Sequence, residues 1–267
     1  MEIVEKFVRG KYFDSDLCED YIYVDSDFVI LVDGVTAKGK IGDDIFNGGR
    51  IAVDVILKAI KKINPKLTAR QVVDFFCNEI RRKISKKNIY KDIDVSATIL
   101  IYSQYHKEVW RVGDSMFILN DQFHDKQISI DSYMSFVRAF YNNILIKQGL
   151  LYEELLIKDS GREYIMPLLL NMKKFRNSED KNFGYGAIDC GYVLDRYLEV
   201  YKVQLPSEII FCSDGYPKIF KSLYESEKYL EYILSKDPLC INSFLCTKGK
   251  MAGQVSYDDR AYIKFLC

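Results

Sequence analysis

The stretch YIYVDSDFVILVDG, residues 21–34, holds the pattern that decides the fold of this chain. Two apolar runs flank the turn-forming triplet DSD, so we expect two neighbouring strands of an antiparallel hairpin. The second run ends at Asp33, and Gly34 follows it. A carboxylate at the point where a rigid strand opens into a loop is well placed to hold a ligand.

Helical patterns follow this hairpin. Residues 48–63 carry apolar side chains at helical spacing, and Pro65 is expected to end that helix. A second helix is expected from Thr68, where Gln71 would complete a capping box. Further helices are expected at residues 133–148, which Gly149 would close, after Pro217, and from Pro238.

Strand patterns supply the rest of the predicted core. Three apolar segments, ATILIYSQY, EVWRVG and SMFILN (97–105, 108–113 and 115–120), are divided by short polar turns and indicate an antiparallel meander. Later strands are expected in YLEVYKVQL, EIIFCSD and AYIKFLC. The sequence therefore predicts an α+β fold with two antiparallel sheets packed face to face and flanked by helices. It contains no repeat or linker, so we expect one domain over residues 1–267.

Composition excludes several classes of function. Lys plus Arg and Asp plus Glu both number 38, so no basic excess indicates a nucleic-acid partner. No apolar run approaches the roughly 18–20 residues that span a bilayer, and the N-terminus lacks the apolar stretch of a signal peptide. The seven cysteines form no CxxC pair. We expect a cytoplasmic protein without a membrane partner.

Only two histidines are present, His106 and His124. A His-rich zinc site is excluded, and a Ser-His-Asp triad is disfavoured. Catalysis in this chain must therefore depend on carboxylates, lysines, cysteines or metals.

Four acidic residues have similar surroundings. Asp33 and Asp214 each end an apolar run and precede a glycine, Asp258 precedes the last strand, and Asp20 precedes the first hairpin. A glycine after the acid permits a tight turn and close approach of a ligand. The alternative is structural, because acidic residues and Asp-Gly pairs are common in turns.

Six segments, taken in order, resemble the protein phosphatase 2C family of metal-dependent serine/threonine phosphatases (PPM). Glu19-Asp20 resembles its Asn-Glu-Asp motif, and IIFCSDGYPKIF (209–220) resembles its apolar-Ser-Asp-Gly segment. The other matching segments are VDGVTAKG (32–39), VSATILIY (95–102), VGDSMFIL (112–119) and SYDDRAYIKF (256–265). The resemblance covers most of the chain and implies the same two-sheet sandwich, with a variable helical insertion, or flap, around residues 125–190.

The resemblance also implies a centre with two Mn²⁺ or Mg²⁺ ions. Asp33 would bridge both ions, Asp20 would serve one side and Asp214 with Asp258 the other, and the carbonyl of Gly34 would add a ligand. Asp33 and Asp214 would act in catalysis through the metal-activated water. Hard cations of this kind prefer oxygen ligands, which these residues supply.

The remaining positions are less regular. Glu19 would act through a water, and Asp114 corresponds to a third-metal position of the family. Ser15 stands where the family often has a phosphate-binding arginine, so Arg9 or Lys11 would take that role.

These features favour an enzyme that hydrolyses phosphoserine and phosphothreonine in proteins. A phosphorylated protein would be its substrate, and we expect a monomer. Two alternatives stay open: a catalytically weak or inactive regulatory binding module, which the absence of arginine at position 15 favours, and a hydrolase of a non-protein phosphoester.

Overall fold

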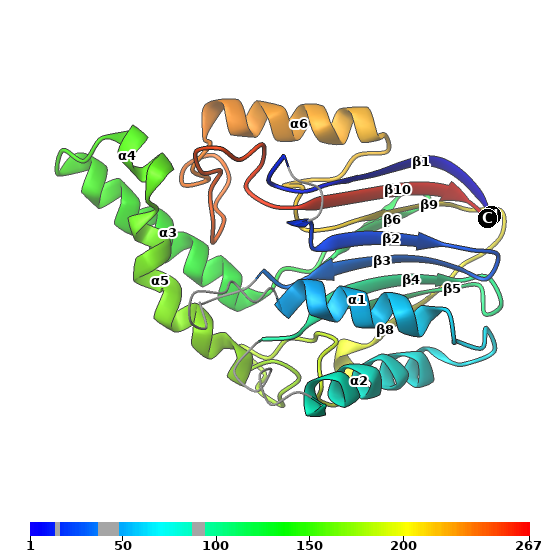
Figure 1. The fold of residues 1–267 in the computed structure, drawn as a ribbon. Helices are drawn as coiled ribbons and strands as arrows, with labels where there is room; N and C mark the ends of the chain where they lie inside the picture. Colours follow the sequence, from blue (N-terminus) through cyan, green and yellow to red (C-terminus); the bar gives the residue numbers. More distant parts are fainter. Residues whose placement is uncertain (14–16, 37–47, 87–93) are drawn as a thin grey trace.

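The computed structural model describes residues 1–13, 17–36, 48–86 and 94–267, which form two five-stranded antiparallel sheets packed face to face (Figure 1). The first sheet contains, in spatial order, β1 (Glu2–Arg9), β10 (Arg260–Leu266), β9 (Glu208–Cys212), β6 (Met116–Leu119) and β7 (Gln122–His124). The second sheet contains β2 (Asp20–Val24), β3 (Phe28–Gly34), β4 (Ala97–Ser103), β5 (Glu108–Val112) and β8 (Glu199–Lys202). The predicted α+β sandwich is confirmed.

The continuous apolar run of β3 is explained by burial on both faces. Ile30 and Val32 pack with the helices that cover the second sheet. Val29 and Leu31 point the other way, into the layer between the sheets, where they meet Phe211 of β9. Since successive side chains of a strand alternate between faces, a strand covered on both sides needs apolar residues at every position.

Helices cover the outer faces and one end of the sandwich. Helices α1 (Gly48–Ile60) and α2 (Ala69–Ser85) lie over the second sheet, and α6 (Leu223–Lys236) lies over the first (Figure 1). Helices α3 (Ser129–Lys147), α4 (Tyr152–Ile157) and α5 (Ser160–Asn171) stand together at one end (Figure 1). The described residues also include the short 3₁₀ turns η3 (Met172–Lys174) and η4 (Asp195–Tyr197).

Predicted helix boundaries are correct in part. Thr68 caps α2, and the reciprocal hydrogen bonds of Thr68 and Gln71 form the predicted capping box. Helix α1 ends at Ile60, several residues before Pro65. The helix predicted from Pro238 was wrong, because residues 238–245 form turns held by the Asp237 carboxylate, which accepts backbone N–H bonds from residues 241–243 at 2.7–3.1 Å.

The predicted meander was also wrong at its third strand. Strands β4 and β5 pair as expected, but β6 pairs with β9 in the other sheet. Gly113 makes the corner between them with φ +105°, and a Cβ there would lie 2.4 Å from the Thr98 side chain. Only glycine fits this left-handed, crowded turn, which passes the chain from one sheet to the other.

Strand β1 was not predicted, because its sequence EIVEKFVR lacks a clean alternation of buried and exposed residues. It pairs with β10 along one edge of the first sheet. Edge strands with charged side chains are common, since such charges discourage pairing with other molecules.

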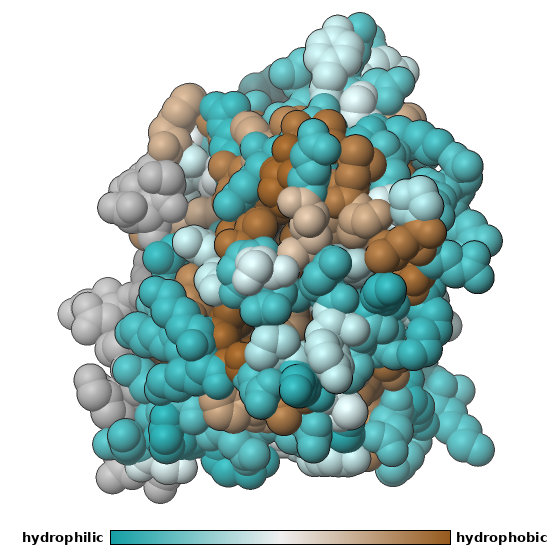
Figure 2. Space-filling model, turned by 90° about the vertical axis from the view of Figure 1, so that its right-hand side faces the viewer, coloured by the Kyte–Doolittle hydropathy of each residue, from teal (hydrophilic) through white to brown (hydrophobic). Residues whose placement is uncertain are grey.

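The two ends of the sandwich differ in character. Helices α3–α5 stand at one end, and the chain terminates at the other (Figure 1). Figure 2 looks at that second end, where apolar residues form a band bordered by hydrophilic ones. In the part of the chain that the structure describes, no helix combines the length and apolar character needed to cross a bilayer.

Candidate active site

Asp20 and Asp33 face each other across the predicted hairpin. Asp20 begins β2, Asp33 lies near the end of β3, and the antiparallel register pairs them directly. Asp20 is buried, with 4% of its surface exposed, and Asp33 is partly buried. Because directly opposed residues of antiparallel strands have Cβ atoms about 4.5–5.5 Å apart, the hairpin brings these carboxylates together at one end of the second sheet.

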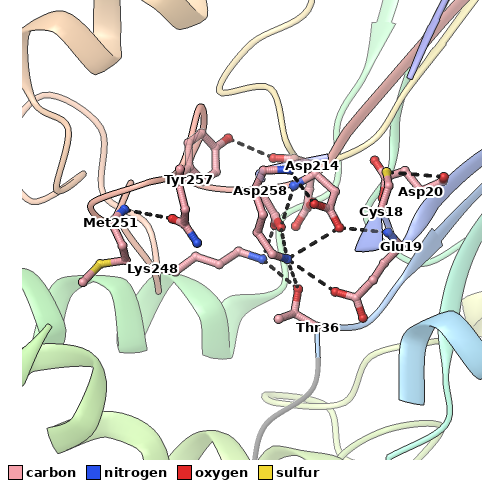
Figure 3. Close-up of polar contacts among 12 residues, drawn as sticks. Cys18, Glu19, Asp20, Thr36, Asp214, Lys248, Met251, Tyr257 and Asp258 are labelled. Atoms are coloured by element: carbon pink, nitrogen blue, oxygen red, sulfur yellow. Dashed lines mark hydrogen bonds and ion pairs between the residues drawn. The ribbon is translucent and has the colours of Figure 1, made fainter. Parts of the chain in front are cut away.

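The first sheet brings two more aspartates to the same end. Asp214 lies two residues after β9, and Asp258 lies two residues before β10. These strands are antiparallel neighbours, so the end of one adjoins the start of the other. The hydroxyl of Tyr257 donates a hydrogen bond to the Asp214 carbonyl at 3.0 Å and ties the two loops together (Figure 3).

The strand-end carboxylates open into one cavity of about 270 Å³. Asp33, Asp114, Asp214 and Asp258 all contribute to its wall. The opposite side comes from the segment before α3, from α5 and from the loop at residues 244–248. The cavity therefore lies between the end of the sandwich and the helical region.

Two lysines reach the carboxylates, and they were only partly foreseen. The ammonium of Lys11 lies 3.4 Å from Glu19 Oε2, 3.4 Å from Asp258 Oδ1 and 3.5 Å from Asp259 Oδ2. The ammonium of Lys248 forms an ion pair with Asp258 Oδ2. Lys11 was predicted to bind phosphate, and Lys248 was not identified at all.

Thr36 lies between the two lysines. Its hydroxyl is 3.3 Å from the Lys11 ammonium and 3.2 Å from that of Lys248 (Figure 3). The backbone N–H of Lys11 also donates to Asp259 Oδ1 at 2.7 Å, which fixes the start of that side chain. Both lysines are thus built into the site and do not extend into solvent.

The pKa values of the aspartates differ according to whether a lysine forms an ion pair with them. Burial raises the pKa of Asp20 and Asp33 well above the ordinary 3.8, and neighbouring carboxylates add to the rise. Burial and the charge of Asp258 likewise raise the pKa of Asp214. Burial also opposes ionisation of Asp258, but Lys248 and Lys11 prevail and lower its pKa. Asp258 therefore has a pKa set by its two lysine partners, whereas burial outweighs the other influences on Asp20, Asp33 and Asp214, including the effect of Lys248 on Asp214.

The donor set can be compared with the needs of a divalent cation. Oδ2 of Asp20 and Oε1 of Glu19 are buried and have no hydrogen-bond partner among the described residues. Unsatisfied carboxylate oxygens of this kind are the donors that hard cations prefer. Within the described ranges, however, no three His, Cys, Asp or Glu side chains have an arrangement that could hold an ion. The donor chemistry fits, while the ligand positions are not preformed.

Glycines allow the backbone to approach closely at this site. The N–H of Gly34 donates to the Glu19 carbonyl at 3.0 Å, and a Cβ on Gly34 would lie 2.9 Å from the backbone of Gly49. A Cβ on Gly49 would lie 2.6 Å from Glu19 Oε1. The start of α1 is therefore pressed against the end of the β2–β3 hairpin, which fixes the position of the Glu19 carboxylate.

The other predicted site residues are distributed unevenly. Asp114 follows the Gly113 corner and lines the cavity. Arg9 is exposed at the end of β1 and is not among the residues that line the cavity. Ser15 lies outside the described residues.

Two further cavity residues, Lys126 and Arg162, were missed by the sequence reasoning. Arg162 lies on α5 and donates to the Thr247 carbonyl at 2.8 Å, whereas Lys126 precedes α3 and pairs with Glu199. No motif marks them, because each is far in sequence from the strand-end aspartates. Their shared position in the predicted flap was the one available signal.

Two solved structures share this architecture over nearly their whole length. The serine/threonine phosphatase Stp1 from Staphylococcus aureus is 13% identical, with a TM-score of 0.52 over 100% of this chain and 95% of that one. The catalytic domain of the serine/threonine protein phosphatase PstP, in complex with two manganese ions, is 11% identical, with a TM-score of 0.50 over 100% and 99%. The chain has the fold of the PPM serine/threonine phosphatases.

No protein-family model matches the sequence of this chain, and a search of curated proteins found no match. At 11–13% identity, the PPM likeness establishes the fold that the six motifs predicted. The metal ligands and the activity remain predictions.

Proposed function

We propose that the chain hydrolyses phosphoserine and phosphothreonine in proteins with the help of a divalent cation, Mn²⁺ or Mg²⁺. The observation that supports this most is the convergence of Asp33, Asp114, Asp214 and Asp258, carried by both sheets, on one cavity. This convergence occurs within a PPM phosphatase fold, at the strand ends that the sequence motifs mark.

Asp20, Asp33, Asp214 and the carbonyl of Gly34 are the residues that would hold the cation. A bound divalent ion would lower the pKa of a water and offset the charge that develops on phosphate. Asp33 and Asp214 come from different sheets, so their separation is set by the packing of the sandwich. The rigid strands thus position the carboxylates, which is the main requirement for such a site.

Cationic side chains around the cavity would bind the phosphate. Lys126, Arg162 and Lys248 all line it, and none lies on the strands that carry the aspartates. A dianionic phosphate would otherwise be repelled by the acidic wall, so these cations are needed for substrate entry. We propose one domain over residues 1–267, in which the insertion around 125–190 shapes this side of the cavity and contacts the protein substrate.

A regulatory binding module is the second candidate. It is favoured by the contacts of Lys11 and Lys248 with Asp258, because these ammonium groups engage a carboxylate that the family resemblance assigns to a metal. A domain of this kind would bind phosphorylated protein without turnover.

The test is hydrolysis of p-nitrophenyl phosphate and of a phosphothreonine peptide by the purified chain, with Mn²⁺, Mg²⁺ or EDTA. We expect metal-dependent turnover of both substrates, and a loss of at least about 100-fold in Asp33→Asn, as expected for removal of a group that stabilises developing charge. Asp121→Asn is the matched control, because Asp121 is exposed and is not among the residues that line the cavity.

The outcomes separate the candidates. Turnover of the small ester alone would favour a non-protein phosphoester as substrate. A folded protein that binds the phosphopeptide but shows no turnover with either metal would favour the regulatory module.

A further inference from the structure

The carboxylate cluster has two parts with different partners. We use "lysine half" for Glu19, Asp258 and Asp259 together with Lys11 and Lys248, and "aspartate half" for Asp20, Asp33 and Asp214. Ion pairs of 4 Å or less join acid to lysine throughout the lysine half. Within the described residues, no Lys or Arg forms such a pair with the aspartate half.

Asp258 has little capacity left for another ligand. Its Oδ2 is paired with the Lys248 ammonium, and its Oδ1 accepts the backbone N–H of Asp259 at 2.9 Å and lies 3.4 Å from the Lys11 ammonium. The Lys248 side chain reaches Asp258 across the cavity and is steadied by Thr36 (Figure 3). Both carboxylate oxygens therefore already face positive charge.

The carboxylates of the aspartate half, in contrast, have no ion pairs among the described residues. Asp20 is 4% exposed, and its Oδ2 has no hydrogen-bond partner in the described part of the chain. Asp33 lies opposite Asp20 in the strand register, and Asp214 approaches Asp33 from the other sheet. Three acidic groups thus share one site, and no described Lys or Arg forms an ion pair with any of them, which is unfavourable unless a ligand supplies the charge.

We propose that this chain binds a single divalent cation in the aspartate half, and that Lys248, supported by Lys11, takes the place of a second ion beside Asp258. The inference rests on the proposed function for the presence of a divalent site, and it specifies the composition of that site. It assigns to Lys248 a role that the sequence motifs do not contain.

The physical reason is competition between like charges. A second divalent ion at Asp258 would have to displace two ammonium groups that are held between carboxylates and the Thr36 hydroxyl. The displaced lysines would remain close to the ion, because Lys11 is anchored by its backbone N–H to Asp259. Breaking buried ion pairs and leaving one partner unpaired is strongly unfavourable, so we expect the second ion to bind on the order of 100-fold more weakly than the first.

The experiment is titration of the metal-free full chain with Mn²⁺. Calorimetry gives the affinities, and the electron paramagnetic resonance signal of free Mn²⁺ gives an independent count of bound ions. We expect one ion per chain in the wild type. Asp214→Asn should weaken that ion at least about tenfold, whereas Asp258→Asn should change its affinity less than about threefold, because the proposal places Asp258 outside the ion's ligands.

Lys248→Met removes the ammonium and retains much of the length of the side chain. We expect it to bind a second Mn²⁺ at least about tenfold more tightly than the wild type does, because one of two competing charges is gone. Lys158→Met, at an exposed lysine of the helical region, controls for the change in net charge. Circular dichroism and thermal unfolding verify that each variant is folded, and the wild-type count stands without any variant.

The results separate this inference from the proposed function. Two wild-type ions of similar affinity, or equal weakening by Asp258→Asn and Asp214→Asn, would overturn the single-ion proposal even if the protein is an active phosphatase. One ion together with no turnover of any phosphoester would support the single-ion proposal and refute the phosphatase. Binding of no Mn²⁺ would refute both.

Discussion

Two buried ionic clusters of this molecule have opposite properties. In the helical region, Arg138 is fully buried, and each of its three nitrogens has a partner: Nε donates to Asp159 at 2.8 Å, and the other two donate to the carbonyls of Leu239, Cys240 and Cys246 at 2.8–3.3 Å. At the end of the sandwich, the aspartate half has no internal cation among the described residues and contains an unpartnered Asp20 oxygen.

The difference separates structure from function. The Arg138 cluster continues through Asn142, which donates to Asp159 at 3.0 Å and accepts the N–H of Gly161 at 2.7 Å. It therefore joins α3, the start of α5 and the loop after α6, with its charges neutralised. Buried charges with complete partners hold a fold together, whereas buried charges without them indicate a place for a ligand. The following predictions test this distinction.

The largest effect is expected at the satisfied cluster. Arg138→Met should lower the free energy of unfolding by about 3–5 kcal/mol, because it removes the cationic partner of the buried Asp159 carboxylate and the donor to three carbonyls. Urea denaturation followed by circular dichroism measures this change. Arg82→Met, at a 59% exposed arginine paired with Glu79, should cost less than about 1 kcal/mol. Equal losses of stability in the two variants would contradict the claim that the buried cluster stabilises the fold more than an exposed ion pair does.

A second satisfied cluster allows a test by pH. Burial alone would raise the pKa of Glu199, but hydrogen bonds from Lys126, Tyr201 and Arg111 lower it from 4.5 to about 2. Because the pKa is lower in the folded protein, the stabilisation is complete above about pH 4.5 and is lost as the pH falls towards 2.

Glu199→Gln should therefore lower the free energy of unfolding by about 2 kcal/mol at pH 7, after allowance for partial solvent screening, and by much less near pH 2.5. Urea titrations at several pH values measure the difference. Glu208→Gln, at a 29% exposed glutamate of β9, controls for general pH effects. A difference that does not change with pH would contradict the assignment.

The unsatisfied cluster should respond in the opposite direction. Asp33→Asn removes one of the mutually repelling carboxylates, so in EDTA we expect the free energy of unfolding to rise by about 1 kcal/mol. Thermal and urea unfolding measure the change, with Asp121→Asn as the exposed control. Destabilisation of the metal-free protein would mean that Asp33 serves the fold, which would remove the contrast between the clusters.

The smallest loss of stability is expected at the cap of α2, where the hydrogen-bonded groups are neutral and exposed. Thr68→Ala removes the cap of α2 and should lower the free energy of unfolding by about 0.5–1 kcal/mol. Thr68→Ser keeps the hydroxyl and should retain most of the stability. If Thr68→Ala lowered the free energy of unfolding as much as Arg138→Met does, the buried ionic cluster would contribute no more to stability than the exposed cap.

Local signals predicted much of the sandwich from the sequence. The hairpin around Asp25-Ser26-Asp27 and the capping box at Thr68 depend on neighbouring residues, so their patterns are visible in short stretches. The change of sheet at Gly113 depends instead on contact with Thr98, and β1 depends on pairing with β10 at the other end of the chain. Neither contact has a short-range signature.

The same distinction applies to the site. The aspartates were found because each adjoins an apolar run: Asp33 and Asp214 follow one, and Asp20 and Asp258 precede one. Lys248 was not found, because it lies in an irregular loop and meets Asp258 only through the three-dimensional fold. Arg9 or Lys11 was predicted as the phosphate ligand, whereas the nearest charged partners of Lys11 are carboxylates, a relation that composition and spacing do not reveal.

The two strand-end aspartates, Asp33 and Asp214, have a consequence for local opening of the metal-free protein. Asp33 and Asp214 belong to different sheets, so a change in the charge of these two carboxylates acts between the two layers at this end of the sandwich. Local opening of the metal-free protein should begin there, with fast amide hydrogen exchange at Gly34 and Gly215. A cation bound by aspartates of both sheets would slow amide exchange in both sheets at once. Ligand binding at this end would therefore raise the local stability of both layers.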